Sequence, residues 1–537
     1  MSFAPPRRLA VRLRLAIAAA LAVATSGCGG NETSADPCAG IDCGGHGTCY
    51  TDGVWALCAC EPGWRPAGTS CVPEGDVGDV PREAGDADDG GDVADVPGCD
   101  PSGADDHCVE GVRFRCRADG SGFDGEPCRW GCDPAGRRCG ELRIPNLGDP
   151  GLLDAGTGRL FPAGATEPYV VLDTDTGAIT THDADGNLVA SLRLPVSGLD
   201  PVTGIHFVVR AQGAGHPGLG VFSMSDLAIP EGLTVVGKGA NALVLLVSVD
   251  VDIAGTLTVA ARAAPWIQEA GPGGGAGGGA SPPSRGSGPG GGAPGDEDGS
   301  VTRIDTGGGG GGHGGSGGAG GDTSSGTLGG AGGVFHGTAV LEPLTGGSGG
   351  GSGGDTGNRS GSGGPGGGAL ELVAGGNLVV RGRIDAGGGG GRGGRGGALY
   401  GAGPGGGGGS GGSILLQAPT IRVSGVVAAN GGGGGGGGHG VDAGNAGQDG
   451  QGSLVAARGG TGARPGENDG GAGGAGDHPD GHDAPDVAGS SLEVHTGGGG
   501  GAAGILRFNG RDVDLDGATL SPSPASARTT IGPLPTE

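Results

Sequence analysis

The stretch NALVLLVSVDVDIAGTLTVA, residues 241–260, decides the fold of this chain. Apolar residues recur at every second position from Leu243 to Val259, and the later intervening positions are mostly Ser, Asp and Thr. Alternation with a period of two is typical of a β-strand that buries one of its faces. The stretch therefore predicts strands that bury an apolar face on either side of Gly255.

The same unit returns three times further along the chain. The copies run over residues 370–386, 414–429 and, more weakly, 505–520. The first apolar residue and the central glycine lie 12 positions apart for Leu243 to Gly255, Leu370 to Gly382 and Ile505 to Gly517, but 11 apart for Ile414 to Gly425. In the shorter copy the apolar phase changes parity at Pro419-Thr420. Because side chains alternate strictly along a strand, this change predicts a one-residue deletion at a corner.

Recurring strand pairs separated by insertions are typical of a parallel β-helix, whose coils bury their apolar faces only against one another. The runs at 205–210, 227–229 and 233–236 are expected to supply further coils. The predicted fold class is mostly β, with two disulfide-rich modules followed by a β-helix-like solenoid over residues 145–537. Long glycine-rich inserts interrupt this solenoid at about 270–335, 345–368, 387–412 and 431–504. They leave from comparable points of the repeat, so we expect them on one side.

Glycine dominates the inserts and limits what they can build. The chain has 142 Gly among 537 residues, against 8 Phe, 4 Trp and 3 Tyr. Gly buries no side chain, and ordering each residue costs about 1–2 kcal/mol of backbone entropy. The inserts are therefore expected to be disordered. Packed polyglycine helices are the alternative for stretches such as 431–438, whereas collagen is excluded because Gly does not recur at every third position.

The charge balance excludes one class of partner. The formal net charge is −27, and Lys238 is the only lysine among 31 basic residues. Nucleic-acid binding requires basic groups that neutralise phosphates. We therefore expect no nucleic-acid partner.

The N-terminus predicts export. Four arginines between positions 7 and 14 precede an apolar run, 15–24, that is too short to span a bilayer, which is typical of a signal peptide over residues 1–27. The next residues, Thr25-Ser26-Gly27-Cys28, resemble a bacterial lipobox, with Thr25 where Leu is usual. The resemblance implies lipidation of Cys28 and a lipid anchor in the outer membrane or at the surface of a Gram-negative bacterium. The alternative is ordinary cleavage with Cys28 as a stray thiol, but without Cys28 the 13 cysteines divide into two clusters of six.

The first cysteine cluster has a specific spacing, Cys38-x4-Cys43-x5-Cys49-x8-Cys58-x-Cys60-x10-Cys71, with Gly63-Trp64 after the fifth cysteine. This spacing resembles an EGF-like domain over residues 37–72. The resemblance implies the disulfides Cys38–Cys49, Cys43–Cys58 and Cys60–Cys71. Calcium-binding members carry acidic and amide residues just before the first cysteine, whereas this chain has only Asp36 there, so calcium is not favoured at this module.

A charged segment separates the first cluster from the second. Residues 73–98 are rich in Asp and Glu and contain no aromatic residue, which predicts a solvated, flexible linker. The second cluster, in a module over residues 99–140, consists of Cys99, Cys108, Cys116, Cys128, Cys132 and Cys139. Cys128 and Cys132 alone would permit zinc ligation, but export favours disulfides. Six cysteines allow 15 pairings, and the sequence does not choose among them.

Metal and phosphate motifs in the glycine-rich part are weak. Gly232 to Lys238 nearly matches a phosphate-binding loop, but Gly239 replaces the required hydroxyl residue. Gly-Gly-x-Gly-x-Asp patterns lack the apolar residue that tandem calcium repeats need after Asp. The most suggestive cluster is His478, Asp480, His482 and Asp483, whose imidazoles and carboxylates are candidate ligands for calcium or zinc. The alternative is an acidic solvated loop, so no cofactor is firmly expected.

The alternation of polyglycine with strand copies resembles glycine-rich surface lipoproteins of myxobacteria, which brings no known reaction. We expect a non-enzymatic surface protein in adhesion, matrix or envelope structure, or recognition, with surface polysaccharide or protein partners. The alternative is a polysaccharide lyase or hydrolase, because parallel β-helices host such enzymes. The strands offer that alternative only scattered charges, Arg381, Arg383, Asp385 and Arg422.

Overall fold

The computed structural model describes the chain in two compact units, residues 1–94 and 95–537. The described residues are 43, 46–51, 56–61, 64–67, 70–73, 99–133, 135–160, 167–297, 305–355, 358–397, 401–487 and 494–537. In the first unit they form two antiparallel hairpins, β1 (Gly47–Thr51) with β2 (Ala56–Cys60) and β3 (Trp64–Ala67) with β4 (Ser70–Pro73). Helix is confined to two short 3-10 turns among the described residues, η1 (Pro150–Asp154) and η2 (Pro524–Ser526).

The second cysteine module is a three-stranded antiparallel sheet held by three disulfides. Its strands are β5 (His107–Val109), β6 (Val112–Cys116) and β7 (Phe123–Pro127). The disulfides are Cys99–Cys116, Cys108–Cys132 and Cys128–Cys139. Cys128 and Cys132 thus pair with different partners, and neither is a free thiolate for zinc.

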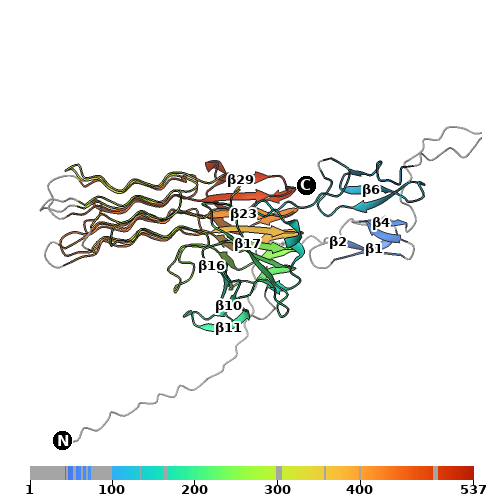
Figure 1. The fold of residues 1–537 in the computed structure, drawn as a ribbon, viewed down its shortest axis with the longest axis horizontal. Coiled ribbons are helices and arrows are strands. Elements are labelled where there is room, and N and C mark those ends of the chain that lie inside the picture. The colour runs from blue at the N-terminus through green and yellow to red at the C-terminus, as the bar shows by residue number, and fades with distance from the viewer. Residues whose placement is uncertain are drawn as a thin grey trace, which may run out of the picture. The chain divides into compact units, whose positions relative to one another are not determined.

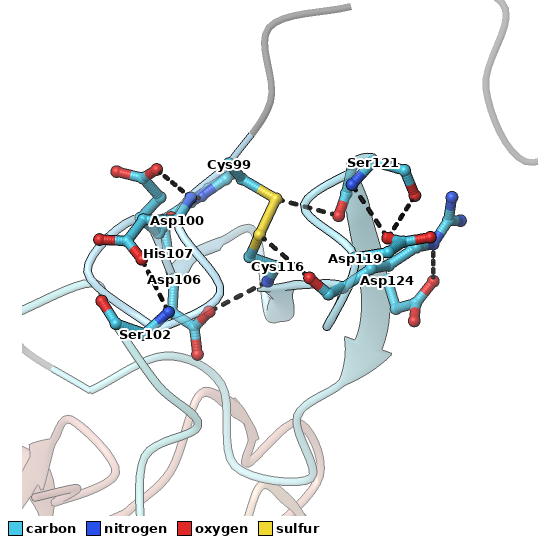
Figure 2. Close-up of a disulfide and its surroundings, with 12 residues drawn as sticks. Cys99, Asp100, Ser102, Asp106, His107, Cys116, Asp119, Ser121 and Asp124 are labelled. Carbon is cyan, nitrogen blue, oxygen red and sulfur yellow. Dashed lines mark hydrogen bonds and ion pairs between the residues drawn. A yellow bond between two sulfur atoms is a disulfide. The ribbon is translucent and has the colours of Figure 1, made fainter.

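Short polar turns surround the first of these disulfides (Figure 2). The Asp106 carboxylate accepts the backbone N–H of Cys116 at 3.1 Å, and this hydrogen bond lowers the pKa of Asp106. Asp119 accepts both the backbone N–H and the hydroxyl of Ser121. The carboxylates therefore fix loops that a module with so few apolar residues cannot fix by packing.

Three largely parallel sheets form the body of the second unit (Figure 1). The first contains β12 (Gly198–Leu199), β13 (His206–Arg210), β14 (Leu219–Met224), β17 (Ala242–Val247), β20 (Ala369–Ala374), β23 (Ser413–Gln417), β26 (Ile505–Asn509) and β29 (Thr529–Gly532). The second contains β8 (Arg159–Leu160), β15 (Asp226–Ile229), β18 (Val251–Ile253), β21 (Asn377–Val380), β24 (Thr420–Val423) and β27 (Asp512–Asp514). The third contains β9 (Tyr169–Asp173), β10 (Ile179–His182), β11 (Leu188–Arg193), β16 (Thr234–Lys238), β19 (Thr256–Thr258), β22 (Arg383–Asp385), β25 (Val426–Ala428) and β28 (Thr519–Ser521).

From β14 to β28 the chain visits the three sheets in strict rotation, and each strand pairs in parallel with its counterpart in the next round. The predicted runs at 227–229 and 233–236 join these rounds as β15 and β16. The run at 205–210 does not, because β13 pairs antiparallel with β14. Antiparallel strands thus start the first and third sheets, and parallel strands continue them.

The register confirms the predicted repeat and its corner deletion. Leu243, Leu370 and Ile414 are aligned across the first sheet, and their apolar neighbours at every second position face one core. Val373 aligns with Gln417 and Asn377 with Thr420, so the third copy is one residue shorter at that corner.

The start predicted for the fourth copy is wrong by one residue. Leu506, not Ile505, aligns with Ile414, and Leu506 faces the core. Ile505 belongs to a second buried cluster, which includes Leu142, Ile144 and Leu246 and covers the opposite face of the first sheet. Ile505 and Leu506 are both apolar, so alternation alone does not reveal which one points inward.

The prediction of disordered inserts is also wrong for the described residues. The excursions between the third and first sheets, 259–368, 386–412 and 429–504, are extensively hydrogen-bonded from backbone to backbone, and most of their glycines are buried. The inserts predicted at 270–335 and 345–368 belong to one excursion, in which Leu341 and Leu344 return to the second buried cluster. Figure 1 shows the glycine-rich segments running side by side away from the sheets. Backbone pairing between segments, which composition cannot reveal, offsets the entropy cost.

Candidate functional site

The glycine-rich segments form one body, which we call the glycine bundle: the described parts of 271–336, 346–368, 386–412 and 429–504. Inside it, the amides of residues 305–315 change partner with a period of three. Gly308 and Gly311 donate to Gly405 and Gly408, Gly309 and Gly312 to Ala293 and Gly290, and Gly310 and His313 to Gly318 and Gly315, all at 2.8–3.0 Å. The carbonyls of Gly308, Gly309 and Gly310 accept from Gly499, Gly351 and Gly333.

Residues 305–312 make no hydrogen bonds with one another, and a three-residue period without internal hydrogen bonds is the pattern of a left-handed polyproline-II-type helix. Residues 305–315 are therefore surrounded by neighbouring stretches of chain. Their N–H groups donate to three of these stretches, and their carbonyls accept from three others. The segments 403–412, 431–438 and 494–504 repeat this arrangement. The bundle is thus a lattice of helices that pair laterally, and it is the alternative that the sequence left open.

Many interior positions of this lattice accept only glycine. A Cβ added to Gly310, Gly407 or Gly498 would collide with the carbonyl oxygen of Gly500, Gly309 or Gly406 respectively. These obstacles are backbone atoms of paired segments, so they cannot rotate away. Interior side chains such as those of Ser348, Ser410 and Thr496 hydrogen-bond to backbone groups of neighbouring segments. Exposed side chains such as those of Arg392 and Arg395 stand on outer rows of the bundle.

The predicted metal cluster lies on such an outer row. Asp480, Asp483 and Asp486 follow one another at the three-residue period, and their carboxylates accept the backbone N–H groups of Ser316, Ala319 and Asp322 at 2.7, 2.6 and 2.9 Å. His478 and His482 are exposed. Among the residues that the structure describes, no group of three or more His, Cys, Asp or Glu side chains is arranged to hold a metal ion. The predicted ligands are therefore not brought together, and the carboxylates pair with a neighbouring segment instead.

A buried histidine lies where the bundle meets the sheets. The His313 Nδ1–H donates to the carbonyl of Gly411 at 2.9 Å, and the ring lies 4.7 Å from that of His336. Burial lowers the pKa of His313 to about 3, so the imidazole is neutral at ordinary pH. His313 thus fills space inside the bundle as a neutral side chain and hydrogen-bonds to the backbone of a neighbouring segment.

A polar cleft of about 770 Å³ opens at the side of the bundle. Three stretches of chain line it: 262–268 after β19, Arg392 in the excursion 386–412, and 446–458 in the excursion 429–504. The lining side chains are Arg262, Ala264, Pro265, Gln268, Arg392, Ala446, Gln448, Asp449, Gln451, Val455, Ala456 and Arg458. Sequence reasoning missed this site, because its residues lie far apart and inside segments expected to be disordered.

Asp449 organises the cleft. Its Oδ1 accepts the Arg262 Nη1–H at 2.7 Å and the backbone N–H of Gly390 at 2.7 Å. The Arg262 side chain is only 12% exposed. Arg392 and Arg458 are exposed, and Arg392 Nη2 donates weakly to Gln268 Oε1 at 3.4 Å. The cleft therefore combines one fixed guanidinium with two that are available to a ligand.

The charges named for the enzyme alternative lie outside this cleft, Arg381 and Arg422 along the second sheet and Arg383 and Asp385 on β22 of the third sheet. Arg381 pairs with Asp252 at 2.8 Å, and Arg422 pairs with both Asp512 and Asp514 at 3.2 Å. Arg383 is exposed at the start of β22, and the Asp385 carboxylate accepts the N–H of Gly387 at 2.9 Å. Arg381 and Arg422 are thus engaged in half-exposed ion pairs, each worth about 0–1 kcal/mol.

Several predicted sites fall outside the described residues. These include the signal peptide, Cys28, Cys38, the linker at 74–98 and the side chains of Cys49, Cys58, Cys60 and Cys71. Cys43 is disulfide-bonded. In the part of the chain that the structure describes, no helix has the length and apolar character needed to cross a bilayer.

No family model, curated protein or solved structure matches this chain.

Proposed function

We propose that this chain is an exported, lipid-anchored protein of a Gram-negative cell surface that binds extracellular material and catalyses no reaction. In this proposal Cys28 carries the lipid, the EGF-like module and the acidic linker space the body from the membrane, and the three sheets are the walls of a parallel β-helix. The partner is a surface polysaccharide or protein.

The ordered glycine bundle is the observation that carries the proposal. Three excursions leave after the third sheet and return at the first, and they pair laterally into one lattice with a cleft at its side. Such a body holds exposed side chains in fixed positions without a mobile loop, and preorganised surfaces lose less entropy on binding.

The charged face of the second sheet does not favour the enzyme alternative. Its arginines are paired with carboxylates at 2.8–3.2 Å, and they are exposed rather than set in a water-excluding pocket. Glycosidic-bond chemistry uses two carboxylates flanking the bond, one of which acts as an acid. We therefore assign this face to solvation.

Display of the full-length chain on a Gram-negative host tests the proposal. Labelling with a radioactive fatty acid should mark the wild-type chain but not a Cys28→Ser variant, and surface protease should cleave only the former on intact cells. Displaying cells should be retained on immobilised extracellular polysaccharide without releasing soluble fragments. Release of oligosaccharides with turnover, or the absence of both labelling and retention, would overturn the proposal.

A further inference from the structure

We propose that the cleft lined by Arg262, Arg392 and Arg458 binds the carboxylate groups of an acidic polysaccharide. This inference rests on the proposed function, since it names the ligand class of the same binding protein. The chain has a net charge of −27, yet three guanidinium groups and a single carboxylate line this cleft.

Arg262 is the fixed group of the cleft, held by an ion pair with Asp449. Asp449 takes only its Nη1, and the Nε atom is buried with no hydrogen-bond partner among the described residues. The backbone of Arg262 has a φ of 54°, in the left-handed region that non-glycine residues rarely occupy. Strain of this kind costs about 1–3 kcal/mol and persists where surrounding contacts impose it, commonly at binding sites.

The two exposed arginines come from separate segments that the lattice fixes. Arg392 stands on the outer row of its helix, one turn before Arg395, while its backbone N–H donates to Ser362 and its carbonyl accepts from Gly406. The backbone of Arg458 is bound to Gln448 through both its N–H and its carbonyl. Both residues are thus exposed while hydrogen bonds hold their backbones in place. This arrangement suits the binding of carboxylates along a polysaccharide chain.

The remaining lining matches a sugar chain. Gln268, Gln448 and Gln451 carry amides that each make a hydrogen bond within the protein and keep further donor or acceptor capacity for hydroxyl groups. Val455, which is 66% exposed, and Ala456 offer apolar contact to the face of a sugar ring. A volume of about 770 Å³ lies in the range of ligand sites and holds several sugar units.

Binding of short oligogalacturonates to the full-length protein, measured by isothermal titration, tests the inference. Arg392→Ala and Arg458→Ala should each weaken binding by roughly tenfold to a hundredfold, as expected for loss of a hydrogen bond to a charged group. Arg395→Ala is the matched control, because Arg395 is exposed on the same row but does not line the cleft. It should leave the affinity unchanged, and all three variants should melt at the wild-type temperature.

Three comparison ligands complete the test. Neutral dextran should not bind, and poly-glutamate and single-stranded DNA should compete weakly. Affinity for oligogalacturonate that is unchanged in both arginine variants, or stronger binding of dextran, poly-glutamate or DNA, would overturn the inference. If displaying cells adhere to polysaccharide although the purified protein binds no oligogalacturonate, the cleft assignment fails and the proposed function stands. If oligogalacturonate binds but is cleaved, the proposed function fails instead.

Discussion

At the scale of single residues, the glycine bundle depends on glycines, which have no side chain. At interior positions of the glycine bundle such as Gly310, Gly407 and Gly498, the neighbouring segment lies so close that a hydrogen must take the place of a Cβ atom. Glycine is usually a cost in regular structure, because it loses the most backbone entropy on folding. Here the close approach that it permits lets each backbone group find a partner in an adjacent segment, and this pairing offsets the cost.

Substitution of one interior glycine tests this role. In Gly310→Ala the new methyl group would meet the carbonyl of Gly500, so we expect a loss of about 1–3 kcal/mol or more in the free energy of unfolding, as for overpacked cores. Urea unfolding followed by circular dichroism measures it, with the slope of the transition unchanged. Gly279→Ala is the control within the bundle, because its added Cβ meets only Ser284 Oγ at 3.7 Å. That variant should be neutral or stabilised by about 0.4–1 kcal/mol; equal losses in both variants would contradict the lattice.

Glu371 on β20 predicts a pH dependence. Its carboxyl group is buried beneath the segment that carries Asn146, which donates to Oε2 at 3.0 Å, and Oε1 has no partner among the described residues. Burial raises the pKa of Glu371 from 4.5 to about 7. Because the folded state holds the proton more tightly than the unfolded state, the stability from this group is full below about pH 4.5 and is lost as the pH rises to about 7.

Glu371→Gln removes that titration and keeps the shape. The difference in unfolding free energy between this variant and the wild type should therefore grow by about 3 kcal/mol between pH 4.5 and pH 7, in favour of the variant, and stay constant above. Thermal or urea unfolding of both proteins across this range measures the difference. Both proteins contain the same buried histidines, so the titration of these groups does not contribute to the difference. A difference that does not change with pH would show that Glu371 is not buried as described.

At the scale of elements, the strands could be predicted from the sequence and the bundle could not. Each strand buries one face, so alternation marks it, and the change of parity at Pro419 locates a real corner deletion. In the bundle the pairing is between backbones, so an ordered lattice and a disordered tract have the same composition. The sequence pattern that does indicate the ordered bundle is the three-residue spacing of polar side chains on its surface, as in Asp480, Asp483 and Asp486.

The second cysteine module makes an element-scale prediction. Its disulfides connect the first cysteine to the third, the second to the fifth and the fourth to the sixth. Proteolysis of unreduced protein followed by mass spectrometry should recover the peptide pairs that contain Cys99 with Cys116, Cys108 with Cys132 and Cys128 with Cys139. Recovery of Cys128 and Cys132 as reduced thiols together with stoichiometric zinc would contradict this connectivity.

At the scale of the whole molecule, the stacked sheets determine where the bundle forms. Each excursion leaves after a strand of the third sheet and returns to the first, so stacking the strands also stacks the roots of the glycine helices. This arrangement brings Arg262, Arg392 and Arg458 to one cleft although they lie almost 200 residues apart in the chain. The central claim is therefore that the glycine-rich segments are a folded body and not loops.

Hydrogen exchange of the full-length protein, followed by mass spectrometry of its peptides, tests that claim most directly. Amides of 305–315, 403–412, 431–438 and 494–504 are hydrogen-bonded to neighbouring segments, so they should exchange as slowly as those of the strands β17, β20 and β23. Exchange of these glycine-rich peptides at the rate of an unstructured chain, while the strands remain protected, would contradict the account.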